Sequence, residues 1–461
     1  MRAAYRGLPE GAAPRIAKRT SNLFRFRSDS TTAIDVSGLD RVLAVDPQRR
    51  TADVAGMITY EQLVDATLPY GLMPLVVPQL RTITLGGAVT GLGIESTSFR
   101  NGLPHESVLE MEILTGAGEV VVATPDNEHA DLFMAFPNSY GTLGYALRLT
   151  IELEPVKPYV KLRHLRFPDA AAAMATLNQI WDAGAYQEEA VDFVDGVAFA
   201  RDEVYLTLGG FADEAPATGE APATGEGPAT GEGPATSDYT GMDIYFQSIR
   251  QRDVDHLTIY DYIWRWDTDW FWCSGAFGLQ RPAIRRLWPR RYRRSDVYRR
   301  LVAYDRRHRI SARIDRFRGR PETEAVIQDI EVPVDRVADF LDFFHREVGI
   351  SPVWLCPLRL RGGSESRTWP LYPLEPDVRY VNLGFWSGVP LPKGREDGYY
   401  NQLIEQEVTR LDGHKSLYST AFYSAEEFWR LYNGAAYREA KRTYDPQGRL
   451  LNLYDKCVRN R

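Results

Sequence analysis

Residues 78 to 102 read PQLRTITLGGAVTGLGIESTSFRNG, and the glycines of this stretch alternate with small and hydroxylated side chains. Glycine permits positive φ angles and has no Cβ, so consecutive backbone amides can face the oxygens of a phosphate. The stretch therefore predicts a loop whose backbone lies against a ligand. A Rossmann fingerprint fits poorly, because Gly91-Leu92-Gly93 is not followed by a third glycine opening a helix, and a Walker loop lacks its GK[ST] ending. The alternative is an ordinary structural loop.

The sequence on both sides of this stretch predicts a unit of strands and helices. Residues 51–76 predict a strand and then a helix, whose first turn Thr59 and Gln62 would cap reciprocally and which would end at Gly71. Residues 106–155 predict two strands around a Gly-Ala-Gly turn, then a second glycine turn and an alternating strand. The predicted order is strand, helix, glycine loop, hairpin, glycine turn and strand.

This order and its glycine motifs resemble the flavin-binding domain of the vanillyl-alcohol oxidase and p-cresol methylhydroxylase family. Within that family the chain is most similar to the delta24-sterol reductase branch. The resemblance is carried by LGGAVTGLGIESTSFRNGL at 85–103, NSYGTLG at 138–144, EPVKPYVKLR at 154–163, PVWLCP at 352–357 and EEFWRLYNGAAYREAKRTYDPQGRLLNLYDKC at 426–457. The glycine motifs are shared across the wider family, whereas GLGIES, YVKLR and PVWLCP point to the sterol-reductase branch.

The resemblance implies an α+β fold in which a two-part, PCMH-type flavin-binding domain is joined to a separate substrate cap domain of antiparallel sheet and helices. Residues 1–157 would form the FAD-binding domain, 158–415 the cap, and 416–461 a C-terminal segment that returns to the flavin. Helical apolar spacing at 169–184 and 334–349 agrees with a cap that contains amphipathic helices. The family usually has a strand and a helix before its first loop, so the N-terminal part is expected to be short or its start codon to be placed late.

The implied cofactor is FAD, bound noncovalently. Relatives that attach flavin covalently often use a histidine in the first glycine-containing loop, whereas the first histidine here is His105. Covalent attachment through a histidine of the cap, such as His256, remains an alternative. The resemblance assigns flavin contacts to Arg19, Thr20, Ser21, Asn22, Thr84, Leu85, Gly86, Gly87, Gly91, Gly93, Ile94, Glu95, Ser96, Ser98, Gly141, Thr142, Gly144 and Ala146. For the isolated serines and threonines, turn formation is the alternative.

Candidate catalytic residues come from YDYIWRWDTDWFWC at 260–273 and from the C-terminal segment. Aromatic walls with a few polar groups suit a pocket for a flat or isoprenoid substrate, in which Tyr262 or Arg265 would donate a proton or hold an oxyanion. The alternative is an aromatic segment of the cap core. Lys441, or else Lys456, would place positive charge beside the flavin, with a surface ion pair as the alternative for Lys441.

The reaction implied by the resemblance is hydride transfer from NAD(P)H through FAD to a carbon–carbon double bond of a sterol or isoprenoid-like lipid. The resemblance thus implies a flavoprotein oxidoreductase of steroid metabolism. An FAD-dependent alcohol dehydrogenase or oxidase on the same scaffold remains an alternative, as does a binding protein of flavin fold that has lost its activity. The sequence leaves the substrate, the electron partner and the oligomeric state open.

Composition narrows the class of protein. The chain has 461 residues, 44% hydrophobic and 25% charged, which is ordinary globular usage. A net charge of −7 argues against nucleic acid as a partner. The three cysteines are widely spaced, so neither a metal site nor a disulfide framework is expected and a cytoplasmic location is the default. No apolar run is long enough to predict a transmembrane segment.

Two further segments stand out. The basic run RRLWPRRYRRSDVYRR at 285–300 predicts a solvated helix face, with a site for a nicotinamide-cofactor phosphate or a peripheral contact with an acidic membrane as alternatives. Residues 214–237 repeat a six-residue unit of Glu, Pro, Ala, Thr and Gly. Because this composition cannot bury enough apolar surface, we predict a disordered insertion that extends a hairpin loop between strands at 202–211 and 239–248.

Overall fold

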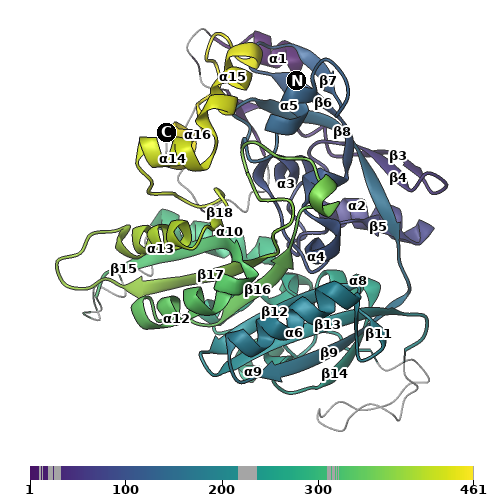
Figure 1. Ribbon diagram of the computed structural model, residues 1–461, viewed down its shortest axis with the longest axis vertical. Helices are drawn as coiled ribbons and strands as arrows, with labels where there is room; N and C mark the ends of the chain where they lie inside the picture. The colour runs from purple at the N-terminus through teal and green to yellow at the C-terminus, as the bar shows by residue number, and fades with distance from the viewer. Residues whose placement is uncertain are drawn as a thin grey trace.

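The structure is a computed structural model, and it describes residues 1–9, 12, 14–18, 24, 33–215, 236–308, 313, 317, 319 and 321–459. Four predicted cofactor contacts, Arg19, Thr20, Ser21 and Asn22, lie outside the described residues, as do residues 216–235 of the repeat. The fold is α+β, as predicted, and is organised around two sheets (Figure 1).

The first sheet is formed by the N-terminal third of the chain, in the strand order β3-β4-β8-β6-β7, with β5 paired to β8. Its strands are β3 (Val42–Asp46), β4 (Thr51–Ala55), β5 (Leu72–Pro74), β6 (Val108–Thr115), β7 (Val120–Ala123) and β8 (Gly144–Pro155). The predicted hairpin and the final alternating strand are thereby confirmed. Helices α2 (Tyr60–Thr67), α3 (Leu85–Gly91), α4 (Ser98–Asn101) and α5 (Ala130–Ala135) accompany this sheet.

Helix α2 has the predicted capping box. Gln62 N donates to Thr59 Oγ1 at 3.3 Å, and Thr59 N donates to Gln62 Oε1 at 3.1 Å. A short 3₁₀ turn extends the helix to Gly71, whose φ of 67° is the left-handed conformation that glycine adopts without strain. The predicted start and end of this helix are both confirmed.

The glycine stretch differs from the predicted loop in one respect. Residues Leu85–Gly91 form helix α3, because Thr84 adopts an extended backbone and its Oγ1 accepts a hydrogen bond from Gly87 N at 3.3 Å. Gly86 N also donates to Gly56 O at 3.0 Å, which joins the helix to the turn after β4. The glycines therefore serve close packing of a helix as well as a turn.

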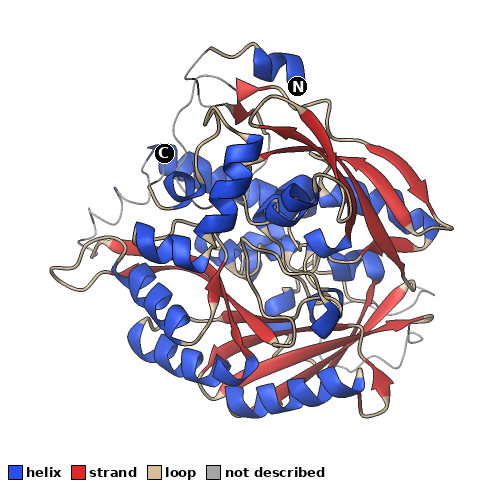
Figure 2. Ribbon diagram, turned by 45° about the horizontal axis from the view of Figure 1, so that its top comes forward, coloured by secondary structure: helices blue, strands red, loops and turns tan. Residues whose placement is uncertain are grey.

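The second sheet has eight antiparallel strands in the order β14-β9-β13-β12-β16-β17-β15-β18. They are β9 (Tyr159–Phe167), β12 (Phe193–Ala200), β13 (Glu203–Ala212), β14 (Val254–Thr258), β15 (Thr323–Pro333), β16 (Val353–Leu358), β17 (Tyr380–Pro390) and β18 (His414–Lys415). Helices α6 (Ala170–Ala183), α12 (Val337–Glu347) and α13 (Tyr399–Arg410) cover one face, as Figure 2 shows.

The two faces of this second sheet bury different sets of side chains. On β15, Val326 and Ile330 pack with the three covering helices in one hydrophobic cluster. The alternate residues Ala325, Ile327 and Asp329 line a cavity on the other face. This period-two pattern orients one side of the sheet towards the first domain.

One predicted strand is wrong. Residues 239–248 contain the short helix α7 (Tyr245–Ser248) rather than a strand, and β14 takes the place beside β9. The buried guanidinium of Arg285 holds this segment in turns, since it donates to the carbonyl oxygens of Tyr239, Gly241 and Asp243 at 2.9–3.0 Å. Among the described residues on the two sides of the repeat, β13 pairs with β9 and β12 and does not form the predicted hairpin with residues 239–248.

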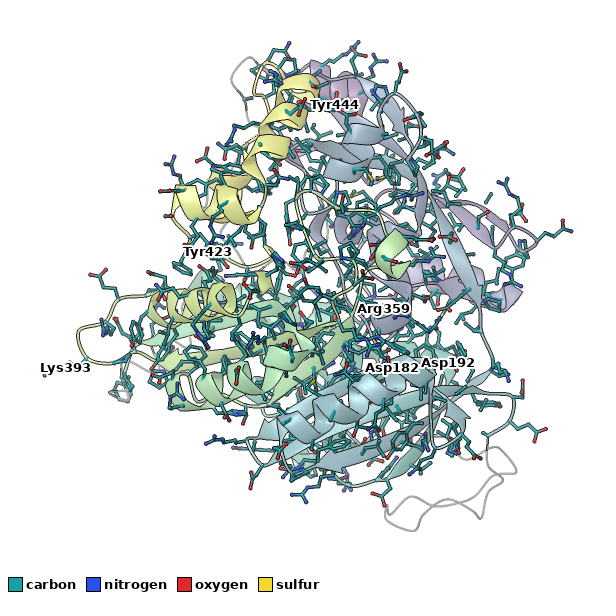
Figure 3. All side chains as sticks on the ribbon, in the orientation of Figure 1. Asp182, Asp192, Arg359, Lys393, Tyr423 and Tyr444 are labelled. Atoms are coloured by element: carbon teal, nitrogen blue, oxygen red, sulfur yellow. The ribbon has the colours of Figure 1, made fainter. Side chains whose placement is uncertain are left out.

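The C-terminal helices α14 (Ala425–Leu431), α15 (Gly434–Tyr444) and α16 (Leu453–Cys457) return to the first domain. Tyr444, at the end of α15 (Figure 3), donates to Asp131 Oδ1 of α5 at 2.6 Å. Other elements are α1 (Arg2–Arg6), β1 (Arg15–Ile16), β2 (Ala33–Ile34), β10 (Ala185–Tyr186), β11 (Glu189–Ala190), α8 (Ile259–Ile263), α9 (Pro282–Leu287) and α10 (Ser295–His308). Within the described part of the chain, no helix is long and apolar enough to cross a membrane.

Candidate functional site

A cavity of about 870 Å³ lies between the two sheets. Residues around α3 form one wall, β15 and β17 of the second sheet form the opposite wall, and the C-terminal segment contributes Lys456. A volume of this size is at the upper end of the usual range for small-molecule sites. The glycine motifs and the aromatic segment that the sequence singled out therefore meet at one place.

The first wall is built from backbone rather than from side chains. A Cβ at Gly91 would stand 3.1 Å from the ring of Tyr140, and one at Gly93 would stand 3.0 Å from Pro78. A Cβ at Gly87 would stand 2.7 Å from Thr84 Oγ1 and 2.9 Å from Lys18 Nζ. A side chain at any of these positions would crowd its neighbours, so the wall is formed by backbone that a flat or phosphorylated ligand can approach closely.

Half of the predicted cofactor contacts lie on this cavity. The lining includes Thr84, Gly86, Gly87, Gly91, Gly93, Ile94, Gly141, Gly144 and Ala146. The structure does not bring Leu85, Glu95, Ser96, Ser98 or Thr142 to the lining. Leu85 is in the hydrophobic core, and Thr142 Oγ1 donates to Ser139 O at 2.7 Å, which is the turn-forming role. Ser98 Oγ likewise accepts from Glu95 N at 3.1 Å.

Arg265 forms a buried charge cluster beside the cavity and does not line it. Its Nη2 lies 2.8 Å from Asp195 Oδ2 and 3.2 Å from Glu95 Oε1. Burial raises the pKa of Glu95 to about 7, and the neighbouring carboxylate of Asp195 acts in the same direction. The cluster joins the glycine stretch of the first domain to strand β12 of the second.

Tyr262 belongs to the same cluster. Its hydroxyl shares a hydrogen bond of 2.7 Å with Ser96 Oγ, and the guanidinium of Arg265 lies 4.1 Å from the centre of its ring. Burial raises the pKa of Tyr262 well above its ordinary value. Tyr262 does not line the cavity. Its hydroxyl therefore contacts Ser96 in the protein interior and does not face a ligand in the cavity.

The two lysines of the C-terminal segment occupy different places. Lys441 Nζ donates to the carbonyl oxygens of Thr142 and Leu450 at 2.7 and 2.8 Å and lies 2.7 Å from Asp445 Oδ2. It therefore ties α15 to the glycine turn, away from the cavity. Lys456 lines the cavity and donates to Tyr140 O at 2.6 Å. Of the two alternatives, Lys456 is the one that the structure brings to the cavity.

The second wall is aromatic. Its members are Trp270, Phe271, Trp272, Trp354 and Trp386. Phe271 is central, with its ring centre 4.6 Å from that of Trp386 and 5.4 Å from that of Trp354. The dense aromatic stretch of the sequence thus contributes its second half to the cavity and its first half to the buried charge cluster.

Asp329 and Tyr418 are the polar groups of this wall that sequence reasoning missed. Asn382 Nδ2 donates to Asp329 Oδ1 at 3.3 Å, and Tyr418 also hydrogen-bonds to the carboxyl group. Trp386 Nε1 donates to Tyr418 OH at 3.1 Å. Burial raises the pKa of Asp329 to about 7. The sequence signal was a carboxylate within the strand-like run IQDIEVP at 327–333, which also contains Gln328 and Glu331.

Lys18 is a further lining residue that the sequence did not single out. It directly precedes the motif RTSN at 19–22, which lies outside the described residues. Its Nζ approaches Gly87, so a positive charge lies against the glycine wall. A backbone cradle with a lysine on one side and an aromatic chamber on the other fits a dinucleotide that carries a flat, redox-active ring.

Comparison with known proteins agrees with this geometry. Residues 14–124 match the family described as "FAD binding domain". Delta(24)-sterol reductase of Arabidopsis thaliana is 26% identical over 449 residues, covering 93% of this chain and 77% of the relative. Delta(24)-sterol reductase of Homo sapiens is 26% identical over 425 residues, covering 91% and 76%.

A shorter match has a different activity in its name. Decaprenylphosphoryl-beta-D-ribose oxidase of Mycolicibacterium smegmatis is 34% identical over 160 residues, which is 34% of this chain and 35% of that relative. The two kinds of relative share oxidoreductase names and the matched domain binds FAD. The chain is therefore an FAD-dependent oxidoreductase with an FAD-binding domain in its N-terminal part, and it is similar along most of its length to Delta(24)-sterol reductases.

Proposed function

We propose that the protein reduces a carbon–carbon double bond of a sterol or isoprenoid-like lipid, with NAD(P)H as the electron donor and noncovalent FAD as the cofactor. The observation that carries this proposal is the aromatic chamber directly across the cavity from the glycine wall. Five aromatic side chains would bury an apolar hydrocarbon and exclude water. The names of the relatives that match over most of the chain support the same substrate class.

The glycine wall would hold the cofactor. Gly86, Gly87 and Gly91 line the cavity on the side where the cofactor would lie, and Lys18 and Lys456 supply positive charge. Bound FAD would supply hydride transfer between the nicotinamide and the substrate. Among the described residues that line the cavity there is no histidine, which supports noncovalent rather than histidyl attachment.

Saturating a double bond adds one hydride and one proton. The two electrons come from NAD(P)H, which is oxidised to NAD(P)⁺, and the proton must come from an acid in the cavity wall. Asp329, hydrogen-bonded to Tyr418, has a carboxyl group that is protonated in an appreciable fraction of molecules near neutral pH. We therefore assign the proton to the Asp329–Tyr418 pair, with water restoring it after each cycle.

An anaerobic titration tests this function. The purified protein should show flavin absorbance that bleaches with NADPH and returns when a sterol with a double bond at carbon 24 is added, with formation of the saturated sterol. Acid precipitation should release the flavin into the supernatant, because no covalent bond holds it. Flavin that NADPH reduces but neither sterols nor polyprenyl alcohols reoxidise would refute the proposed substrate class.

The oxidase-named relative favours one second candidate, an alcohol oxidase or dehydrogenase on the same scaffold. In that case the flavin would resist NADPH and would bleach when a lipid-linked sugar or another alcohol is added. The same titration, begun from the oxidised protein, therefore separates the two directions of electron flow.

A further inference from the structure

A basic surface follows the aromatic segment and takes no part in the chemistry above. Between residues 281 and 308 the chain has eleven arginines and two aspartates, although the whole protein has a net charge of −7. The region comprises α9, the turn after it and α10. We call five of its exposed arginines the arginine surface: Arg281, Arg286, Arg290, Arg291 and Arg300.

Other arginines of the region fix its shape from within. Arg285 is buried and donates to three backbone carbonyl oxygens of the segment 239–243. Arg293 is also buried and donates to Trp288 O at 3.0 Å, and Arg294 donates to Glu61 Oε2 at 2.7 Å. Because these guanidinium groups hydrogen-bond to the protein interior, the exposed arginines are held on a defined scaffold rather than on a loose loop.

Apolar side chains project among the exposed arginines. Leu287 is 85% exposed, Tyr292 is 41% exposed and Ile284 is 37% exposed. Ile284 and Leu287 are three residues apart on α9 and share one helix face, whereas Arg285 points into the protein. Single exposed apolar residues are ordinary, but three within nine residues between arginines form an amphipathic patch.

This patch adjoins the mouth of the cavity. Gly275 and Ala276 line the cavity and are themselves exposed, so the cavity opens there. Phe277 stacks on Tyr298 of α10 with ring centres 6.1 Å apart, and Val302 of α10 lines the cavity. One continuous segment therefore forms both the rim of the aromatic chamber and the arginine surface.

We propose that the arginine surface docks the protein on an anionic lipid membrane, with Ile284, Leu287 and Tyr292 entering the interfacial layer and the cavity mouth facing the bilayer. Guanidinium groups attract acidic headgroups, and exposed aliphatic and aromatic side chains gain energy on entering the boundary with the acyl chains. The proposed docking depends only on the residues of this surface and not on the proposed function. Delivery of a lipid substrate from the bilayer rests additionally on the proposed function.

The phosphate of a nicotinamide cofactor explains the surface less well. Arg286, Arg290 and Arg291 do not line the cavity where the flavin would be reduced. An 85% exposed leucine between them contributes nothing to phosphate recognition, whereas it is the side chain expected at a bilayer interface.

Vesicle co-sedimentation of the full-length, flavin-containing protein tests the docking without using activity. We expect binding to phosphatidylcholine vesicles that contain about one-third phosphatidylserine, weak binding to pure phosphatidylcholine, and release at about 1 M salt. Equal binding to both kinds of vesicle, or binding to neither, would overturn the proposal. Because no turnover is measured, the result is independent of the substrate that the enzyme reduces.

Charge and insertion are tested by separate variants. A triple variant that removes three exposed cations should lower the partition coefficient for anionic vesicles at least tenfold, with flavin content unchanged: Arg286→Gln, Arg290→Gln and Arg291→Gln. The matched control removes three exposed arginines from α12, α13 and the turn before α12, on the far face of the second sheet, and should bind as the wild type does: Arg336→Gln, Arg346→Gln and Arg410→Gln. An equal loss of vesicle binding in both triple variants would mean that only the net charge of the protein matters. The arginine surface would then be rejected as the docking site.

Leu287→Ser should weaken vesicle binding severalfold even at constant charge. Leu43→Ser is its control, since Leu43 is 54% exposed on β3 of the first sheet. If the arginine triple keeps full vesicle binding but loses reduction of its flavin by NADPH, the surface is a nicotinamide-cofactor site and the membrane proposal fails.

Discussion

Asp329 on β15 and Gly384 on β17 lie directly opposite each other across the antiparallel pair, and the carboxyl group of Asp329 fills the space that a side chain at position 384 would need. Trp386 closes that space from the other side, because a Cβ at 384 would stand 2.8 Å from its Cη2 atom. The missing side chain thus lets the carboxyl group lie beside the aromatic wall and face the cavity.

Replacing this glycine should separate flavin reduction from substrate reduction. In Gly384→Ala the added methyl group displaces the Asp329 carboxyl group, so reoxidation of the reduced flavin by a carbon-24 unsaturated sterol should slow by about tenfold or more. Flavin retention and reduction by NADPH should stay as in the wild type. Gly38→Ala is the control, since a Cβ there meets nothing within 4 Å. Stopped-flow absorbance measures both steps, and equal slowing of both would contradict the assignment.

The pH dependence of substrate reduction tests Asp329 as the acid. An acid donates only while it is protonated, and burial raises the pKa of Asp329 to about 7. The rate should therefore be flat below about pH 7 and should fall about tenfold for each pH unit above it. Asp329→Asn should be slow at all pH values and lose this limb, whereas Asp335→Asn, at an exposed position, should keep it. A wild-type profile that is flat to about pH 9 would exclude Asp329.

The same raised pKa affects stability. The ordinary pKa of an aspartate is 3.8, and the pKa of Asp329 rises to about 7 on folding. The folded state therefore favours the protonated carboxyl group. The contribution of Asp329 to the free energy of unfolding is fully present at low pH and is lost as the pH rises to about 7. The free energy of unfolding of Asp329→Asn minus that of the wild type should therefore increase between about pH 4 and pH 7, by up to about 4 kcal/mol. Denaturant titrations at several pH values measure this difference. If this difference in the free energy of unfolding did not depend on pH, the pKa of Asp329 would not be raised by folding.

The glycine wall could be predicted from the sequence because close backbone approach is a local property. Thr59 with Gln62 likewise indicated a capping box from residues three apart. The opposite wall could not be predicted in this way, since Asp329 faces the cavity only through the pairing of β15 with β17 and the period-two orientation of its strand. The carboxylate was visible in the sequence of this strand, but its surroundings were not.

Tyr262 and Arg265 show the converse limit. Their composition suggested a catalytic pocket, and the partners that bury them, Glu95 and Asp195, are 170 and 70 residues away from Arg265 in sequence. Density of aromatic and charged residues marks an important segment without distinguishing a ligand-facing surface from a buried ion cluster. Only the arrangement of the two sheets in space shows that the first half of that segment belongs to the buried ion cluster and that its second half lines the cavity.

Tyr262→Phe distinguishes the two roles directly. Loss of the hydrogen bond to Ser96 should cost about 1 kcal/mol of stability and leave substrate reduction at full flavin occupancy unchanged. Arg265→Met should cost far more, about 3–5 kcal/mol, because it leaves the carboxylates of Glu95 and Asp195 buried without their cation. Thermal or denaturant unfolding gives the stability and stopped-flow gives the rate. A Tyr262→Phe protein that folds normally but reduces sterol slowly would restore Tyr262 as the proton donor.

Flavin retention tests the backbone wall itself. A Cβ at Gly87 already meets Thr84 Oγ1 at 2.7 Å and Lys18 Nζ at 2.9 Å, so the branched side chain of Gly87→Val would displace the lysine and occupy the space of the cofactor. We expect the variant to purify without flavin absorbance and to melt at a temperature that added FAD no longer raises. Gly38→Val, at a position with nothing within 4 Å, should purify with its flavin. Circular dichroism must show that both variants are folded; a folded Gly87→Val protein that is still yellow would mean that the cofactor lies against a different part of the cavity.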